Sequence, residues 1–145
     1  MKVFNYTVVI EKDEEGNYLA ICPALQGCYS EGRTKQEALE MIKDAIKLHI
    51  EDRLANNELL YEEVFSNKVE VIVWAQNTPT TNARKLIKIL EEKGFTFSRQ
   101  SRSHAIYANT NGVKVTVPVH GKKDIGKSLL KQIMIDAGLT NEDFL

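Results

Sequence analysis

Cysteine, proline and tryptophan are scarce in this sequence of 145 residues, which has 2 Cys, 3 Pro and 1 Trp. Cys22 and Cys28 are too few for a disulfide framework, and they lack the partners that a tetrahedral metal site needs. The three histidines, His49, His104 and His120, show no metal-ligand spacing. We therefore expect a reduced protein with no metal and no cofactor.

Long hydrophobic runs are also missing. No stretch approaches the roughly 20 apolar residues that span a bilayer. The opening MKVFNYTVVIEKD has one basic residue before its first acidic one and no sustained apolar segment, so we expect no signal peptide and a cytoplasmic location. Hydrophobic residues make up 43% and charged residues 27%, as in ordinary globular proteins with a real core.

The chain also has no large excess of positive or negative charge, since its net charge is −1. The balance conceals an asymmetry between two halves. Residues 1–78 carry 8 Lys/Arg against 14 Asp/Glu, and residues 79–145 carry 11 against 6. A basic part that faces nucleic acid and an acidic part that covers it would produce this pattern. Two solvated surfaces of different charge would produce it as well.

The first half alternates or concentrates β-branched and aromatic residues in short segments. They predict strands at residues 2–11, 18–22, 27–31 and 69–74. Thr34 and Glu37 form a capping box that begins a helix. The apolar residues of that helix recur at helical spacing: Leu39, Ile42, Ile46, His49 and Ile50. The predicted order is β-β-β-α-β, and residues 75–79 form a short tether of at most about 17 Å.

The second half has a different order of elements. A helix capped near Thr80, Thr81 or Asn82 ends at Gly94, and strands follow at residues 95–97, 103–108 and 113–117. Asn111-Gly112 is the strongest hairpin signal. Ser128 is the predicted cap of a last helix that ends at Gly138. The order α-β-β-β-α is that of double-stranded-RNA-binding domains, so the fold class is α+β with domains at residues 1–75 and 80–145.

The string YTVVIEKDEEGNYLAICPALQGCYSEGRTKQEALEMIKDAIKLHIE resembles the HicB antitoxin domain. The shared features are the strand with an acidic turn, the Pro-containing loop that ends in Gly27-Cys28, and the helix start with Glu37 and Ala38. The resemblance implies a partial ribonuclease-H-like fold without a catalytic carboxylate set, which acts by binding a toxin. The helix-turn-helix or ribbon-helix-helix segment that such antitoxins carry is replaced by the second half, so we expect no DNA binding.

The strings ARKLIKILEEKGFTFSRQSRSHAIYANTNGVKVTVPVH and LLKQIMIDAGLTNEDFL resemble the HicA toxin. Ser103-His104-Ala105 aligns with the Gly-Ser-His-His segment of that family, and the pattern continues through Pro118 and His120. The resemblance implies that His104 is the catalytic histidine of an mRNA-cleaving endoribonuclease. Arg102 and Ala105 depart from the pattern, which has Gly and a second His at these positions.

Metal-independent RNA cleavage needs a base near neutral pKa and cations that balance the charge on phosphate. His104 suits the first task, although a packed structural histidine would fit the same apolar strand. His120 is a candidate assisting residue or a solvated loop residue, and His49 is expected to be structural. The basic residues expected to bind RNA phosphates are Arg99, Arg102, Lys114, Lys122, Lys123, Lys127 and Lys131.

Three functions follow, in order of preference. The first is a fused toxin–antitoxin protein whose ribonuclease is restrained by the antitoxin domain in the same chain or in a swapped homodimer. The second is a catalytically inactive decoy that binds RNA or protein partners. The third is a DNA-binding regulator. We also expect acidic residues of the first hairpin to cover the basic face of the second half. These residues are Glu11, Asp13, Glu14 and Glu15.

Overall fold

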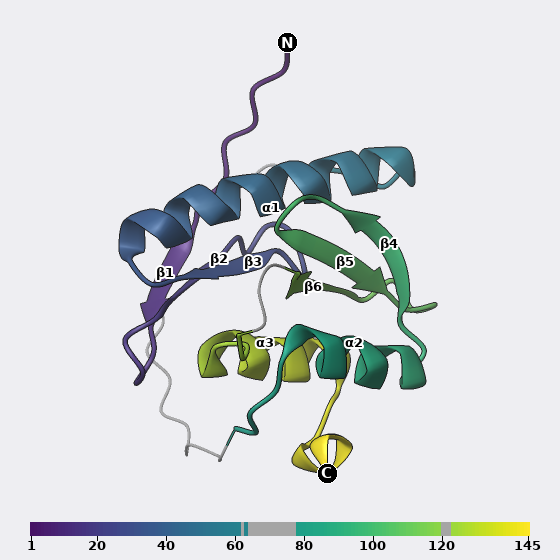
Figure 1. The fold of residues 1–145 in the computed structure, drawn as a ribbon. Coiled ribbons are helices and arrows are strands. Elements are labelled where there is room, and N and C mark those ends of the chain that lie inside the picture. Colours follow the sequence, from purple (N-terminus) through teal and green to yellow (C-terminus); the bar gives the residue numbers. More distant parts are fainter. Residues whose placement is uncertain (62, 64–77, 120–122) are drawn as a thin grey trace.

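In the part of the chain that the structure describes, two three-stranded antiparallel sheets lie between one long helix and two shorter helices (Figure 1). The computed structural model describes residues 1–61, 63, 78–119 and 123–145. The first half contains β1 (Val9–Lys12), β2 (Tyr18–Ile21), β3 (Tyr29–Gly32) and α1 (Lys35–Ala55). The second half contains α2 (Ala83–Glu92), β4 (Thr96–Gln100), β5 (His104–Ala108), β6 (Lys114–Pro118), α3 (Lys127–Ala137) and the 3-10 turn Asn141–Phe144.

The first sheet has the order β1-β2-β3, and its strands are shorter than the sequence predicts. Residues 2–8 lie outside β1, so the prediction of one strand over residues 2–11 is wrong there. The register pairs Val9 with Ile21, and Pro23 soon afterwards ends the partner strand because proline has no N–H to donate. The predicted strand at residues 69–74 lies outside the described residues.

Helix α1 begins at the predicted place, but the predicted capping box forms only in part, because the Glu37 side chain bonds the Arg33 N–H and not the Thr34 N–H. Thr34 accepts a hydrogen bond from the Glu37 backbone N–H at 3.1 Å, and the Glu37 carboxylate accepts one from the Arg33 N–H at 2.8 Å. The most buried side of the helix is not the predicted apolar stripe, of which Leu39, Ile46 and Ile50 are only half-buried. The fully buried positions of α1 are Ala38, Ile42, Ala45, Leu48, His49 and Asp52. The helix covers both sheets (Figure 1), so the residues that it buries are those that face either sheet and not the first sheet alone.

The second sheet has the order β4-β5-β6, and its element order matches the prediction. Gly94, Gly112 and Gly138 all adopt the positive φ expected at helix ends and at the hairpin turn. Ser128 does not cap α3, so this prediction is wrong. The N-cap is Gly126, whose N–H donates to the Glu31 carboxylate at 3.0 Å, so an acid from β3 satisfies the helix start.

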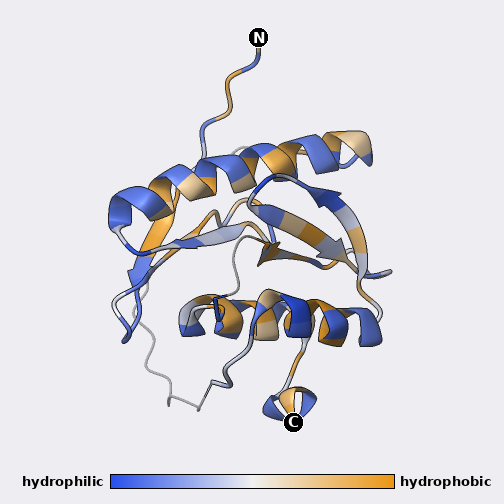
Figure 2. Cartoon of the chain, in the orientation of Figure 1, coloured by the Kyte–Doolittle hydropathy of each residue, from blue (hydrophilic) through white to orange (hydrophobic). Residues whose placement is uncertain are grey.

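The second sheet has two covered faces, and strand alternation assigns residues to each. On β5 and β6, Ala105, Tyr107, Val115 and Val117 pack against α2 and α3 in a common apolar cluster. The alternate residues of the same strands lie toward α1: His104, Ile106, Lys114 and Thr116. Figure 2 shows apolar and polar residues alternating along all three helices, as expected of helices that pack through one face.

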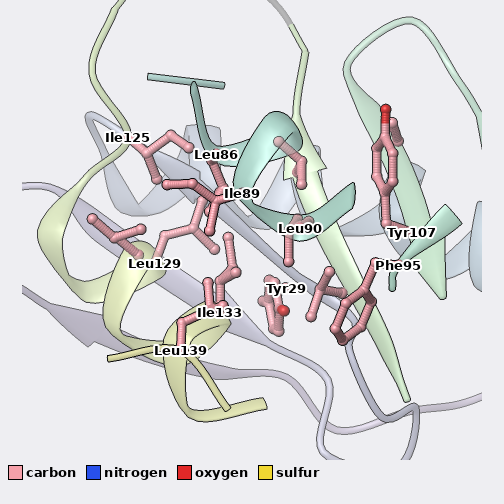
Figure 3. Packing of buried hydrophobic residues seen from close by; sticks show 14 of the residues in the cluster. Tyr29, Leu86, Ile89, Leu90, Phe95, Tyr107, Ile125, Leu129, Ile133 and Leu139 are labelled. Atoms are coloured by element: carbon pink, nitrogen blue, oxygen red, sulfur yellow. The ribbon is translucent and has the colours of Figure 1, made fainter. Parts of the chain in front are cut away.

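The hydrophobic core of the second half includes two residues of the first half. Leu19 and Tyr29 belong to the same buried cluster as Leu86, Leu90 and Ile133. Figure 3 shows the Tyr29 ring among the apolar side chains from α2 and α3. The second half therefore completes its core with side chains from β2 and β3. Among the described helices, none is both long and apolar enough to cross a membrane.

Candidate functional site: a buried interface between the halves

The imidazole of His104 is buried between the halves and is held by two residues of the first half. Its Nδ1 lies 3.0 Å from the Asp44 Oδ2 on α1, and its Nε2 lies 2.8 Å from the Ser30 Oγ on β3. Burial raises the pKa of the Asp44 carboxyl, but hydrogen bonds from Ser101 and His104 outweigh it and hold that pKa below its usual value. Ionised Asp44 therefore accepts a hydrogen bond from Nδ1–H, and Nε2 is within hydrogen-bonding distance of the Ser30 hydroxyl.

Ser30, His104 and Asp44 have the order of groups found in serine hydrolases. A nucleophile must meet its substrate, however, and Ser30 is 2% exposed in the first sheet. We therefore interpret the three residues as a restraint on the imidazole. With both ring nitrogens occupied, His104 has no free position from which to accept a proton from another molecule.

Lys114 is held at the other end of the same face. Its Nζ lies 2.7 Å from the Asp52 Oδ2 on α1 and 2.7 Å from the Glu58 Oε1. Asp52 also accepts a hydrogen bond from the Ser98 hydroxyl at 2.6 Å. Burial raises the pKa of Asp52, but the hydrogen bonds from Lys114 and Ser98 outweigh it and leave that pKa below its usual value. The Lys114 side chain is 5% exposed, and two carboxylates of the first half neutralise its ammonium group.

The loop between β2 and β3 closes the edge of β6. The side-chain amide of Gln26 donates to the Lys114 backbone O and accepts from the Lys114 N–H, both at 3.0 Å. These two hydrogen bonds replace those that the backbone of a neighbouring strand would make. Thr116 donates to the Gly27 backbone O and lies 2.8 Å from the His49 Nε2. Backbone and side chains of the loop thus reach the strand that carries Lys114.

We expect Gly27→Ala to weaken this contact. Gly27 has a φ of +81°, and a Cβ there would lie 2.2 Å from the Lys114 backbone O. Gly16→Ala is the matched control, because Gly16 has a φ of +84° but no atom within 4 Å of its Cβ position. The clash should add about 1–3 kcal/mol to the loss of unfolding free energy seen for the control. Urea denaturation measures both, and equal losses would contradict the close approach.

The stability of the chain should fall as the pH drops below neutral because of His49. Burial, together with Arg53 on the same helix and Lys114 on β6, lowers the pKa of His49 to about 3. Asp52 on α1 acts in the opposite direction, and His104 on β5 in the same direction. In the unfolded chain the pKa is about 6.5, so the unfolded state binds the extra proton between these two values. Stability is then lost as the pH falls from about 6.5 towards 3.

Urea midpoints at pH 7 and pH 5 test this prediction. The wild-type chain should lose about 2 kcal/mol of unfolding free energy between these pH values through His49. In the control His49→Gln, the amide can still bond Thr116 but does not titrate, so this variant should lose that much less. Equal losses in the two proteins would show that His49 is not the group responsible.

The other basic residues predicted to bind RNA are spread over three places. Arg99 is half-buried with its Nε 3.9 Å from Asp52, and Arg102 is exposed on the turn before β5. Lys123, Lys127 and Lys131 are exposed near α3, and the first two line a surface cleft of about 570 Å³ together with Glu15 and Glu31. Lys122 and His120 lie outside the described residues.

The acidic cover comes mainly from α1 and only in part from the predicted hairpin. Glu15 pairs with Lys127 at 3.5 Å, as the hairpin hypothesis requires, but the sheet face is met by Asp44, Asp52 and Glu58. The sequence did contain a signal for the first two, since carboxylates eight residues apart lie on the same broad face of a helix, beside buried positions such as Ala45 and Leu48. His49 is buried, as expected of a structural residue. No group of residues suited to a metal ion occurs in the described part of the chain.

One half of the chain thus covers His104 of the other half, an arrangement that suits a toxin and its antitoxin. Family comparison agrees: residues 6–89 match the HicB-like antitoxin of the bacterial toxin-antitoxin system, and residues 83–139 match the HicA toxin. The chain belongs to the HicB-like antitoxin family and joins that antitoxin domain to a HicA toxin domain. The two matches overlap at residues 83–89, within α2.

Several curated relatives carry the name UPF0150. A UPF0150 protein of Synechocystis sp. is 44% identical over 62 residues, which are 43% of this chain and 78% of the relative. One of Thermoplasma acidophilum is 46% identical over 70 residues, 48% of this chain and 97% of the relative. One of Helicobacter pylori is 51% identical over 53 residues, 37% of this chain and 71% of the relative. Each relative corresponds to about half of this chain or less.

Proposed function

We propose that the second half is a latent, metal-independent endoribonuclease that cleaves mRNA and is restrained by the first half. His104 takes the proton from the attacking hydroxyl of RNA, and basic residues of the same domain balance the charge on phosphate. The observation that carries the proposal is the capture of both ring nitrogens of His104 by Ser30 and Asp44. The contacts between His104 and the first half lie within one chain and would serve as an intramolecular restraint, and a swapped homodimer would use the same contacts.

The proposal includes the division of the chain at residues 75–79 into domains 1–75 and 80–145. We assign the first a partial ribonuclease-H-like fold and the second the arrangement of a double-stranded-RNA-binding domain, in agreement with the element orders. The tether keeps the effective concentration of the antitoxin domain high, so inhibition is the default state. Proteolysis near residues 75–79 is the release step that we propose.

Induction of residues 80–145 alone in growing bacteria tests the ribonuclease. We expect growth arrest and loss of intact mRNA, both abolished by His104→Ala and both absent when the full chain is induced. Circular dichroism of the purified fragments establishes that each is folded. A folded, expressed fragment that is no more toxic than the full chain would refute the proposal.

The second candidate is a catalytically inactive decoy that binds RNA or a partner of an unfused toxin–antitoxin pair. The observation in its favour is the position of Leu19 and Tyr29 in the core of the second half, because separation of the halves would expose apolar surface. A decoy would bind RNA or partners equally well before and after His104→Ala, and neither form would cleave RNA.

A further inference from the structure

Two carboxylates of α1 match the spacing of two proton-donating groups on the sheet below. Asp44 and Asp52 are eight residues apart, about 12 Å along a helix. On the sheet, Lys114 pairs with Ala108, which is four residues from His104, about 13 Å along a strand. The helix therefore presents one carboxylate to His104 and the other to Lys114.

Each carboxylate is bound by a nitrogen donor and a hydroxyl. Asp44 receives His104 at 3.0 Å and Ser101 at 2.7 Å, and Asp52 receives Lys114 at 2.7 Å and Ser98 at 2.6 Å. Donor sets of this kind also bind the phosphate oxygens of nucleic acids. The second set differs from the first in holding a lysine ammonium, whose positive charge attracts the negative charge of a phosphate.

We infer that α1 imitates an RNA strand, with Asp44 and Asp52 in the places of two phosphates, and that Lys114 and Ser98 form a second phosphate site beyond the one at His104. This inference rests on the proposed function and adds to it the distance between two phosphates of the bound RNA. A stacked strand advances about 3.4 Å per nucleotide, so the two sites are about three to four nucleotides apart. RNA and α1 then compete for one surface, and inhibition is competitive with RNA.

The test measures RNA binding by the full chain rather than cleavage. A labelled single-stranded RNA of eight nucleotides is titrated at low salt, and fluorescence anisotropy gives the Kd. Asp52→Asn removes the mimicking charge at nearly constant shape, so this variant should bind RNA at least about tenfold more tightly than the wild type. Glu51→Gln, an exposed neighbour on α1, should leave the Kd unchanged. In the double variant Asp52→Asn/Lys114→Met the Kd should return to about the wild-type value, because the cation that binds the phosphate is gone.

Several outcomes would overturn the inference. One is a folded Asp52→Asn chain that binds no more tightly than wild type, and another is an unchanged gain in the Lys114→Met double variant. If Asp52→Asn fails to fold, Glu58→Gln takes its place, because Glu58 is the other carboxylate that binds Lys114 and its side chain is 39% exposed. Tight binding by the Asp52→Asn chain would support the inference even if the separated second half cleaves no RNA, a result that would refute only the proposed ribonuclease, so the two claims fail separately.

Discussion

Replacing Tyr29 with alanine should lower the free energy of unfolding of the chain by roughly 3–5 kcal/mol. The ring is fully buried between the halves, among Leu86, Leu90 and Ile133 of α2 and α3, and its removal leaves a cavity that these helices cannot fill. The loss should extend to the second half, although Tyr29 belongs to the first. Urea denaturation gives the free energy, and amide hydrogen exchange shows which elements lose protection.

The control for this prediction is Tyr61→Ala, at a tyrosine that is 69% exposed. It should change the free energy of unfolding by less than about 0.5 kcal/mol. If Tyr29→Ala lowers protection only in β1, β2, β3 and α1, the halves are energetically independent. That result would contradict a core shared by the two.

Lys114→Ala should destabilise the chain by roughly 3–5 kcal/mol, because it leaves a buried carboxylate without its cation. Asp52 is 2% exposed and Lys114 is 5% exposed, so water replaces little of the lost interaction. Arg99 stands 3.9 Å from Asp52 and is too distant to replace the 2.7 Å contact of Lys114. Urea denaturation at pH 7 measures the loss.

Lys127→Ala provides the matched control for Lys114→Ala. Lys127 also pairs with an acid of the first half, Glu15, but the two side chains are 50% and 46% exposed. Water screens such a pair, and its loss should cost no more than about 1 kcal/mol. If the two lysine variants lose the same stability, the ion pair at Lys114 does not hold the halves together.

Local signals in the sequence predicted most elements of the second half. Asn111-Gly112 and Gly94 fix backbone conformations within a few residues, and the structure confirms the hairpin and the helix end. The alternation of β6 likewise separates Lys114 and Thr116 from Val115 and Val117. These features depend on contacts that are near in sequence, so the sequence alone reveals them.

The contacts of the candidate site depend on residues far apart in the chain. The sequence marks His104 and Lys114 as polar positions on one face, but it does not say that α1 covers this face rather than RNA or solvent. Asp44 is 60 residues from His104, and Ser30 is 74 residues away. Glu31 replaces Ser128 at the start of α3 for the same reason, since a cap from a distant strand leaves no local signal.

The most direct test of the latent ribonuclease uses the full chain with a protease site placed at residues 75–79. Cleavage of a labelled RNA is followed before and after the protease cuts the chain and the halves are separated. We expect no RNA cleavage by the intact chain, cleavage by the separated second half, and its loss on adding back residues 1–75 or on His104→Ala. A folded, separated second half that leaves the RNA intact would contradict the proposal, as would activity that survives His104→Ala.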